Sequence, residues 1–254
     1  MGSLTGKTAL VTGASRGIGR AIAQRLAADG ALVAVHYGTN HAAAQETTDH
    51  IITNGGRAFP LHAPLGASHS VTGLYAELDS RLSQFGEPPA LHILVNNAGF
   101  HIPGTISDIT PDDFDRLIDI HARTPLFLIQ HALPRMPSGG RIINVTSVTT
   151  RIAHPTALAY TMAKAALQSL TQALAKDLGP RRITINNVAP GYTRTDLNRH
   201  RWDTPEEEAK TAGHSVFNRI ADPSDIADVT AFLASHNSRW ITGQTIDASG
   251  GTHL

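Results

Sequence analysis

Short apolar runs alternate with longer amphipathic stretches along this chain of 254 residues. Runs such as TALV in 7–13 and ILV in 91–99 lack a polar alternation, which is typical of strands that are buried on both faces in a parallel sheet. The predicted strands span residues 7–13, 31–37, 57–63, 91–99, 140–147, 182–191 and 242–251, and the predicted helices span 18–29, 41–56, 71–84, 112–133, 156–178 and 225–235. The alternation therefore predicts one doubly wound α/β domain over residues 1–254, in which helices cover both faces of a parallel, seven-stranded sheet.

The composition argues against several classes of function. Lys and Arg together number 21, as do Asp and Glu, so the chain has no overall positive field to attract nucleic acid or an anionic membrane. No apolar run approaches the length of a membrane span, and the N-terminus lacks a signal-peptide pattern. There is no cysteine, and the 14 histidines form no HExxH pattern. We therefore expect a cytoplasmic protein with no metal site and with neither nucleic acid nor a membrane as partner.

The segment TGASRGIG at 12–19 joins the first predicted strand to the first predicted helix. Its glycines allow a tight turn and let a pyrophosphate approach the amides at the start of the helix, where the helix dipole favours an anion. Three glycines would also fit a bare strand-to-helix turn, but their place after the first strand favours a dinucleotide site. The residues expected to contact the cofactor here are Gly13, Ser15, Arg16, Gly17, Ile18 and Gly19.

The end of the second predicted strand bears on the choice between NAD and NADP. An NAD site usually has an acidic side chain about 20 residues after the glycine turn, where it binds the adenine ribose. Tyr37 occupies that position in VAVHYGTN, and the next carboxylate is Glu46 in the following helix. Nothing there would repel a 2′-phosphate, and Arg16 could pair with it, unless Arg16 is simply a solvated loop residue. We therefore predict NADP, with NAD less favoured, and we include Tyr37 among the cofactor contacts.

A second motif, NNAG at 96–99, follows the fourth predicted strand. In open α/β sheets, ligands bind at the carboxyl ends of the strands. Asn97, Ala98 and Gly99 are therefore expected beside the cofactor, although an Asn–Gly turn is also common without any ligand.

Ser147 ends the fifth predicted strand, and Tyr160 and Lys164 follow one turn apart on the next helix. A free phenol has a pKa of about 10, which a nearby ammonium would lower. Tyr160 could then exchange a proton with a carbonyl oxygen during hydride transfer, while Ser147 hydrogen-bonds the same oxygen. A tyrosine and a lysine at this spacing are most often surface neighbours on a helix. The upstream serine and the two earlier motifs favour a single proton-transfer site.

Taken together, TGASRGIG, NNAG, Ser147 with Tyr160-x-x-x-Lys164, and the PG pair at 190–191 resemble the short-chain dehydrogenase/reductase family, in motif order and over most of the chain. The resemblance implies a Rossmann-type fold and a homotetramer or homodimer formed through the fourth and fifth helices. It also implies that Ser147 positions the carbonyl, that Tyr160 is the acid/base, and that Lys164 activates the tyrosine and binds the nicotinamide ribose.

The resemblance assigns further residues around the cofactor. APGYTRTD at 189–196 is similar to the family segment that binds the nicotinamide carboxamide. The contacts that this implies are Pro190, Gly191, Thr193 and Thr195. Pro64 stands where the family often has an aspartate near adenine, so adenine is expected to contact Leu65 instead. Residues 194–215 correspond to the family's substrate lid, where specificity and mobility reside.

His121 falls where the family usually has an asparagine that holds a water linked to the lysine. A histidine there could bind such a water or carry a proton near pH 6.5, or it could be a satisfied core residue. We include His121 among the candidate catalytic residues.

These features predict an NADP-dependent oxidoreductase that interconverts a carbonyl compound and a secondary alcohol of small size. One alternative is a 3-oxoacyl-carrier-protein reductase, because the C-terminal part resembles that branch as well as the sugar and alcohol dehydrogenases. An acidic carrier protein would need a basic surface near the lid, to which Arg199, Arg201 and Lys210 could contribute. A second alternative is an NADP-binding sensor without catalysis. The substrate itself cannot be derived from loops that have no transferable code.

Overall fold

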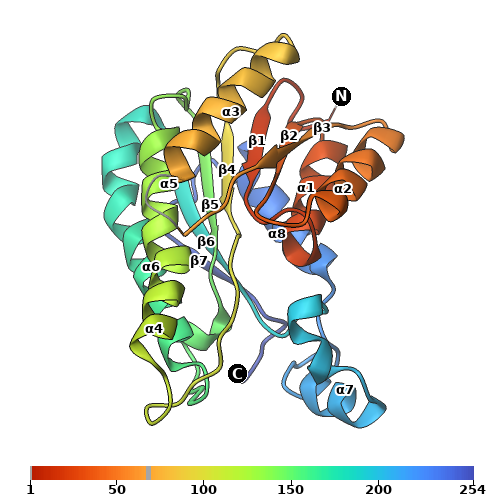
Figure 1. Cartoon of the computed structure of the whole chain (residues 1–254), viewed down its shortest axis with the longest axis vertical. Coiled ribbons are helices and arrows are strands. Elements are labelled where there is room, and N and C mark those ends of the chain that lie inside the picture. The colour runs from red at the N-terminus through yellow and green to blue at the C-terminus, as the bar shows by residue number, and fades with distance from the viewer. Residues whose placement is uncertain (1, 67–69) are drawn as a thin grey trace.

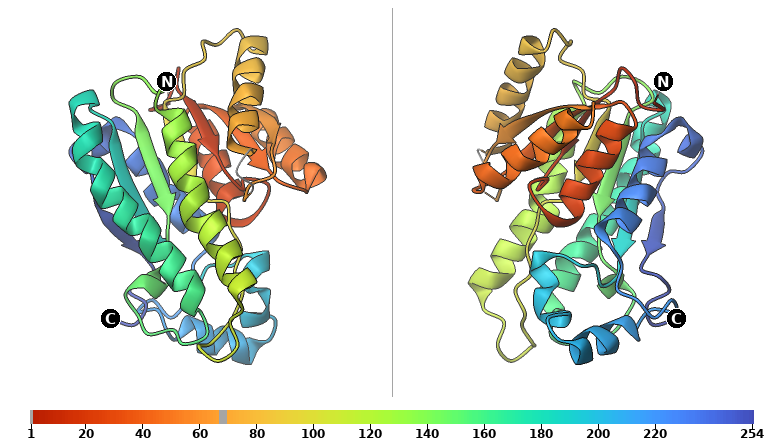
Figure 2. Two further views of the ribbon diagram at one scale, coloured as in Figure 1. Left: turned by 60° about the vertical axis from the view of Figure 1, so that its left-hand side comes forward. Right: turned by 90° about the vertical axis from the view of Figure 1, so that its right-hand side faces the viewer.

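The computed structural model describes residues 2–66 and 70–254. All strands run parallel in one seven-stranded sheet of order β3-β2-β1-β4-β5-β6-β7. Helices cover the sheet on both faces, as Figures 1 and 2 show. The predicted doubly wound, Rossmann-type α/β fold is thereby confirmed.

All strands except β2 end before the predicted residue, and β2 ends at Tyr37 as predicted. Their bounds are β1 (Thr8–Val11), β2 (Leu32–Tyr37), β3 (Arg57–His62), β4 (Ile93–Asn96), β5 (Arg141–Val145), β6 (Thr184–Pro190) and β7 (Thr245–Ala248). Every residue of β1, β2, β4, β5 and β6 is buried, which explains their continuous apolar runs. Thr12, Gly13 and the residues 97–99 follow the last paired residues of β1 and β4, so they belong to loops at the edge of the sheet.

Two hydrophobic clusters hold the helices against the sheet. The helices are α1 (Gly17–Ala28), α2 (His41–Thr53), α3 (Ser70–Gln84), α4 (Pro111–Ile118), α5 (Thr124–Ala132), α6 (Leu158–Leu178), α7 (Pro205–Ala212) and α8 (Pro223–Ala234). Residues of α1, α2 and α8 pack on one face of the sheet, and residues of α3, α5 and α6 pack on the other. None of the helices in the described part of the chain has the length and apolar character of a membrane-spanning segment.

The single helix predicted over 112–133 is interrupted. Thr110 caps α4 by accepting a hydrogen bond from the amide of Asp113, as its sequence predicts, and Pro111 is the first helical residue. A π-helical turn, η1 (Asp119–Arg123), then separates α4 from α5. The wider turn holds two consecutive buried residues, one of which is His121. The prediction of one continuous α-helix was therefore wrong at this turn.

The strand order reverses between β1 and β4, since β1 continues towards β2 and β4 towards β5. In sheets of this kind the connections diverge at the reversal and leave a crevice at the carboxyl ends of the strands. The loops after β1, β4, β5 and β6 meet there. The segment that carries α7 lies apart from the sheet, in light blue at the lower right of Figure 1.

A buried chain of polar side chains ties α6 to the strands beneath it. The Asn96 amide donates to the Asn144 side-chain oxygen (2.8 Å), and the Asn144 amide donates to Thr171 Oγ1 (2.9 Å). The Thr171 hydroxyl donates to Asn187 Oδ1 (2.6 Å), and the Asn187 amide donates to Thr245 Oγ1 (3.0 Å). The chain thus runs from β4 to β7 through one hydroxyl of α6, which fixes the position of that helix over the sheet.

Replacing Thr171 with valine should lower the free energy of unfolding by about 1–3 kcal/mol, because the buried Asn144 NH2 group loses its acceptor and the Asn187 side-chain oxygen loses its donor. Thr230→Val is the matched control, since among the described residues the Thr230 hydroxyl bonds a backbone carbonyl of its own helix and no side chain. Urea denaturation measures both variants. Equal losses of stability in the two would contradict the bracing role of Thr171.

Candidate active site

A cavity of about 900 Å³ lies at the carboxyl edge of the sheet. Its walls come from the glycine turn before α1, the loop after β4, the end of β5, the start of α6 and the segment after β6. The predicted site residues that line it are Gly13, Ser15, Arg16, Gly17, Ile18, Gly19, Leu65, Asn97, Ala98, Gly99, His121, Ser147, Tyr160, Lys164, Pro190, Gly191, Thr193 and Thr195. The fold thus brings residues from distant parts of the sequence to one cavity.

Tyr37 requires a correction. Its ring packs edge-on against His41 (5.5 Å between ring centroids) and close to His62 (5.2 Å), and it is buried outside the cavity lining. Successive side chains of a strand point to opposite faces, so the preceding residue, His36, faces the cavity instead. Beyond Tyr37 the cavity is lined by residues 38–40.

The glycine turn can take its shape only without side chains. Gly13 and Gly17 have φ angles of +65° and +55°, in the left-handed region. A methyl group on Gly19 would lie 2.2 Å from the carbonyl oxygen of Gly13. Arg16 precedes α1 in an extended conformation, and no side chain of the described residues caps the start of that helix. The first amides of α1 therefore face an anion-binding position at the cavity wall.

His36 holds this turn in place, a role that the sequence did not suggest. Its Nδ1 accepts a hydrogen bond from the Gly13 amide (3.1 Å), and its Nε2 lies 2.9 Å from the carbonyl oxygen of Ala63. Nε2 must therefore carry the proton and donate it. Burial lowers the pKa of His36 to about 4, so the ring stays neutral and keeps both bonds at physiological pH. The only signal in the sequence was a histidine within an otherwise apolar strand.

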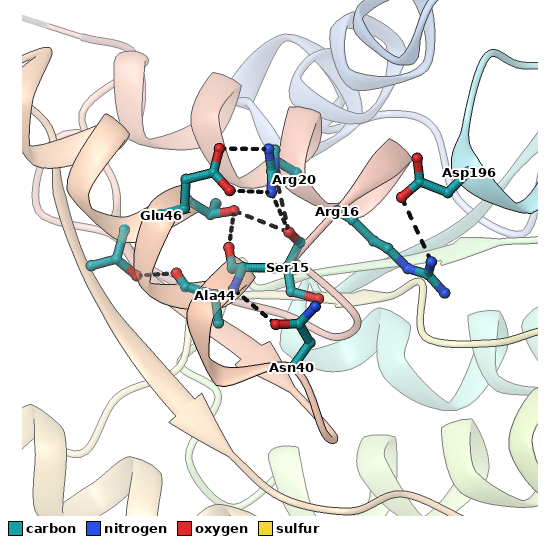
Figure 3. Close-up of polar contacts among 10 residues, drawn as sticks. Ser15, Arg16, Arg20, Asn40, Ala44, Glu46 and Asp196 are labelled. Atoms are coloured by element: carbon teal, nitrogen blue, oxygen red, sulfur yellow. Dashed lines mark hydrogen bonds and ion pairs between the residues drawn. The ribbon is translucent and has the colours of Figure 1, made fainter.

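Two arginines flank the glycine turn, one bonded to it and the other largely exposed to the cavity (Figure 3). Arg20 donates to the Ser15 carbonyl oxygen from both Nε (3.1 Å) and Nη2 (2.9 Å), and it pairs with Glu46 at 3.2 Å. Arg16 pairs with Asp196 across the cavity, at 3.6 Å, and both side chains are mostly exposed. The charge of Glu46 is therefore compensated by Arg20, while Arg16 remains accessible to an anionic ligand.

Ser147, Tyr160 and Lys164 lie along one wall of the cavity. The Lys164 ammonium donates to the carbonyl oxygen of Val145 (2.7 Å) and lies 5.6 Å from the centroid of the Tyr160 ring. Ser147 Oγ accepts a hydrogen bond from the amide of Thr149 (3.2 Å), which fixes the hydroxyl beside the end of β5. The sequence spacing thus corresponds to one spatial cluster.

Burial determines the protonation states in this cluster. It raises the pKa of Tyr160 to about 12, an effect that the Ser147 hydroxyl opposes. Burial also lowers the pKa of Lys164 to about 7. The net lowering of the tyrosine pKa that the sequence suggested is therefore not found, because desolvation of the phenolate is the largest effect on it. Tyr160 is a protonated phenol at neutral pH.

His121 and His101 flank the tyrosine ring. Each histidine meets the Tyr160 ring edge-on, with ring centroids 5.1 Å apart. His121 Nε2 lies 2.7 Å from the Phe100 carbonyl oxygen and so donates to it, while Nδ1 is buried without a partner among the described residues. Burial and the Lys164 charge hold the pKa of His121 well below its usual value. Its expected role as a proton carrier near pH 6.5 is therefore not supported. His101 was missed by the sequence analysis.

The segment after β6 closes another side of the cavity. A methyl group on Gly191 would lie 2.8 Å from Thr252 Oγ1, so the chain can pass there only as glycine. The Thr193 hydroxyl donates to the Gly191 carbonyl oxygen (3.2 Å) and stabilises the turn. Thr195 lies close to the glycine turn on the opposite wall. A methyl group added to Gly17 would lie 3.2 Å from Thr195 Cγ2.

Comparison with known proteins agrees with this geometry. A family model described as enoyl-(acyl carrier protein) reductase matches residues 13–253. The solved structure of the angucycline C-6 ketoreductase LanV with bound NADP is 50% identical, with a TM-score of 0.94, covering 99% of this chain and 97% of that one. The chain belongs to the short-chain dehydrogenase/reductase family. It is therefore an oxidoreductase, as the motifs predicted.

Two further members of the family are similar over nearly their whole length. The reductase LugOII, described as catalysing keto-reduction at C1 during lugdunomycin biosynthesis, is 49% identical, with a TM-score of 0.96 and coverage of 99% of this chain and 100% of that one. A hydroxynaphthalene reductase-like protein, Arp2, from Metarhizium robertsii is 37% identical over 98% of this chain and 96% of its own length. The three relatives named here are all described as reductases or reductase-like.

Adding a methyl group at Gly99 should disturb the site through His121. The new Cβ would lie 2.1 Å from Cε1 and 2.7 Å from Nδ1 of the buried His121 ring. We expect Gly99→Ala to cost about 1–3 kcal/mol of unfolding free energy in the wild-type background, because the cavity wall is overpacked. In a His121→Ala background the same change should cost less than about 1 kcal/mol. Urea denaturation of the four proteins tests this, and equal costs in both backgrounds would contradict it.

The buried lysine predicts a pH dependence of stability. The pKa of Lys164 is about 7 in the folded protein, below the ordinary lysine value of 10.5. At a pH between these two values, the unfolded chain therefore binds more protons than the folded one. The free energy of unfolding should then rise with pH, relative to a Lys164→Met variant, by up to about 1.4 kcal/mol per pH unit between about pH 7 and 9.5. Urea denaturation across this range measures the difference. A constant difference, or one that falls with pH, would show that Lys164 is not desolvated.

Proposed function

We propose that this protein is an NADPH-dependent ketoreductase that reduces a carbonyl group of a polycyclic aromatic compound to a secondary alcohol. The observation that carries the proposal is the placement of Ser147, Tyr160 and Lys164 on one wall of a cavity whose other wall is the uncapped start of α1. A cofactor whose pyrophosphate lies at α1 would extend towards the tyrosine.

The residues present fit NADP. The start of α1 offers backbone amides to the pyrophosphate, and Arg16 is exposed beside it. Residues 38–40 provide small and uncharged groups after β2, and Glu46 is paired with Arg20. Arg16 would form an ion pair with a 2′-phosphate, in competition with Asp196, to which it is paired at 3.6 Å. NADPH, when bound, supplies the hydride.

The protonation states favour the reductive direction. The Tyr160 phenol, with a pKa of about 12, holds its proton at neutral pH and can donate it to the carbonyl oxygen as that oxygen becomes an alkoxide, which is a stronger base than the phenolate. Ser147 would donate a second hydrogen bond to that oxygen and stabilise the same charge. Lys164, with a pKa of about 7, can return a proton towards the tyrosine after the reaction.

We assign His121 a positioning role in this relay. As a neutral ring it holds the Phe100 carbonyl through Nε2 and presents the acceptor Nδ1 inside the site. An acceptor there suits a hydrogen bond from a water molecule next to the Lys164 ammonium, in place of the usual asparagine.

The substrate class rests on the relatives. LanV and LugOII are described as a C-6 ketoreductase of angucyclines and as the enzyme of a keto-reduction in lugdunomycin biosynthesis, and Arp2 is described as resembling a hydroxynaphthalene reductase. The carrier-protein alternative finds less support in the lid, residues 194–215. Arg199 is paired with Asp203, and the first turn of α7 carries Glu206, Glu207 and Glu208, which would repel an acidic carrier.

We also propose that copies of the chain associate through α5 and α6. Leu126 and Met162 are exposed large apolar side chains on these helices, with exposed fractions of 41% and 49%. Burying them against a second copy is favourable.

Replacing Tyr160 with phenylalanine should lower kcat at least about 100-fold, because the proton donor is lost. Tyr37→Phe is the matched control, since Tyr37 packs outside the cavity and its variant should keep full activity. The assay follows NADPH oxidation at a wavelength of about 340 nm with bicyclic aromatic ketones such as 1-tetralone and 2-tetralone, while fluorescence titration checks NADPH binding. Full activity of Tyr160→Phe would rule out the assigned role.

Replacing Arg16 with alanine should raise the KM for NADPH about tenfold or more and change that for NADH much less, because only NADPH carries the 2′-phosphate. Asp196→Asn is the converse variant: it removes the carboxylate that competes for Arg16 and should lower the KM for NADPH. Equal effects of Arg16→Ala on both cofactors would refute the assignment of Arg16.

A further inference from the structure

The outer part of the cavity is cationic. Among the residues described, Asp196 is the one carboxylate that lines the cavity, and it is paired with Arg16. Arg201, on the short helix η4 (Asp196–Arg201), also lines the cavity. In the described part of the chain its guanidinium has no carboxylate within 4.0 Å and donates no hydrogen bond. This partly buried charge therefore lacks an anion.

Arg201 is held in position by an aromatic ring. Its guanidinium carbon lies 4.9 Å from the centroid of the Tyr192 ring, within the range of a cation–π contact. Such stacking restricts the arginine side chain but leaves its N–H groups available. The planar guanidinium can then donate two parallel hydrogen bonds to a pair of anionic oxygens. The neighbouring Arg199, by contrast, is largely exposed and already pairs with a carboxylate, that of Asp203, at 3.2 Å.

Histidines connect Arg201 with the catalytic tyrosine. His101 packs edge-on against Tyr160, and it lies close enough to His154, His200 and Arg201 for their charges to lower its pKa. Burial is the larger cause of that lowering. His101 and His154 are thereby favoured as neutral rings with N–H donors. No group of three or more potential metal ligands occurs in the described residues.

We propose that Arg201 binds an ionised oxygen, a phenolate or a carboxylate, on the aromatic ketone whose carbonyl receives the Tyr160 proton. This inference rests on the proposed ketoreductase function and adds the feature that selects among aromatic ketones. An anion at this position would compensate a guanidinium that has no carboxylate partner among the described residues, with the neutral histidines as additional donors. The two contacts would also orient the substrate, since Arg201 would hold its ionised oxygen at the cavity mouth while its carbonyl lies at Tyr160.

Binding of matched probes to the NADP⁺-saturated protein tests this without requiring turnover. Isothermal titration calorimetry would compare 2-naphthoate with 2-naphthamide, and ionised 2,4-dinitro-1-naphthol with its methyl ether. The first pair tests a carboxylate and the second a phenolate. We expect the wild-type protein to prefer the anion in at least one pair by about tenfold or more, which corresponds to one charge-assisted contact.

The variants identify the residue responsible. Arg201→Gln should reduce the preference to within about twofold, Arg201→Lys should keep part of it, and Arg199→Gln should leave it unchanged. No preference for either anion in the wild-type protein, or a preference that survives in Arg201→Gln, would overturn the proposal. A failure of the protein to oxidise NADPH with any ketone would overturn the ketoreductase function instead, and the binding result would still decide the role of Arg201.

Discussion

The hydrogen bond from the Lys164 ammonium to the Val145 carbonyl oxygen joins α6 to the carboxyl end of β5. Seven residues further along the same helix face, Thr171 bonds to side chains of β5 and β6. These two contacts fix both the rotation and the height of α6 on the sheet. Tyr160 lies one turn before Lys164, so its hydroxyl is placed beside Ser147 by the packing of the helix rather than by a flexible loop.

The same burial that fixes these groups also determines their charges. Tyr160 and Lys164 are removed from water, which favours the neutral form of each: a protonated phenol and an amine with a pKa near neutrality. His121 is neutral for the same reason, and the nearby Lys164 charge adds to the effect. A site with these protonation states is prepared to give a proton to a substrate oxygen. Towards the cavity mouth, Arg201 has no carboxylate within 4.0 Å in the part of the chain that the structure describes.

Much of the fold and many of the site residues could be predicted from the sequence, because they depend on local patterns. Continuous apolar runs identified the buried strands, and the glycine turn, NNAG and the Ser147, Tyr160 and Lys164 spacing identified residues that meet in one cavity. Thr110 and Pro111 likewise marked a helix start through their own chemistry.

The remaining features depend on contacts between distant segments. Which of His36 and Tyr37 faces the cavity depends on how β2 lies in register beside β1, because successive side chains of a strand point to opposite faces. The π-helical turn at His121 is set by packing against Gly99 and Phe100, which no local pattern encodes. The Tyr160 pKa reflects desolvation by the whole site, and the sequence shows only that a lysine is near.

The protonation state of Tyr160 tests this account most directly. Carbon-13 NMR of the tyrosine Cζ atoms, with the Tyr160 signal assigned by comparison with Tyr160→Phe, would follow its ionisation in the protein without nucleotide. With a pKa of about 12, Tyr160 should show the chemical shift of a protonated phenol up to and beyond pH 10, where an ordinary tyrosine is half ionised. Ionisation at or below about pH 10 would contradict the claim that burial keeps this phenol protonated and ready to donate.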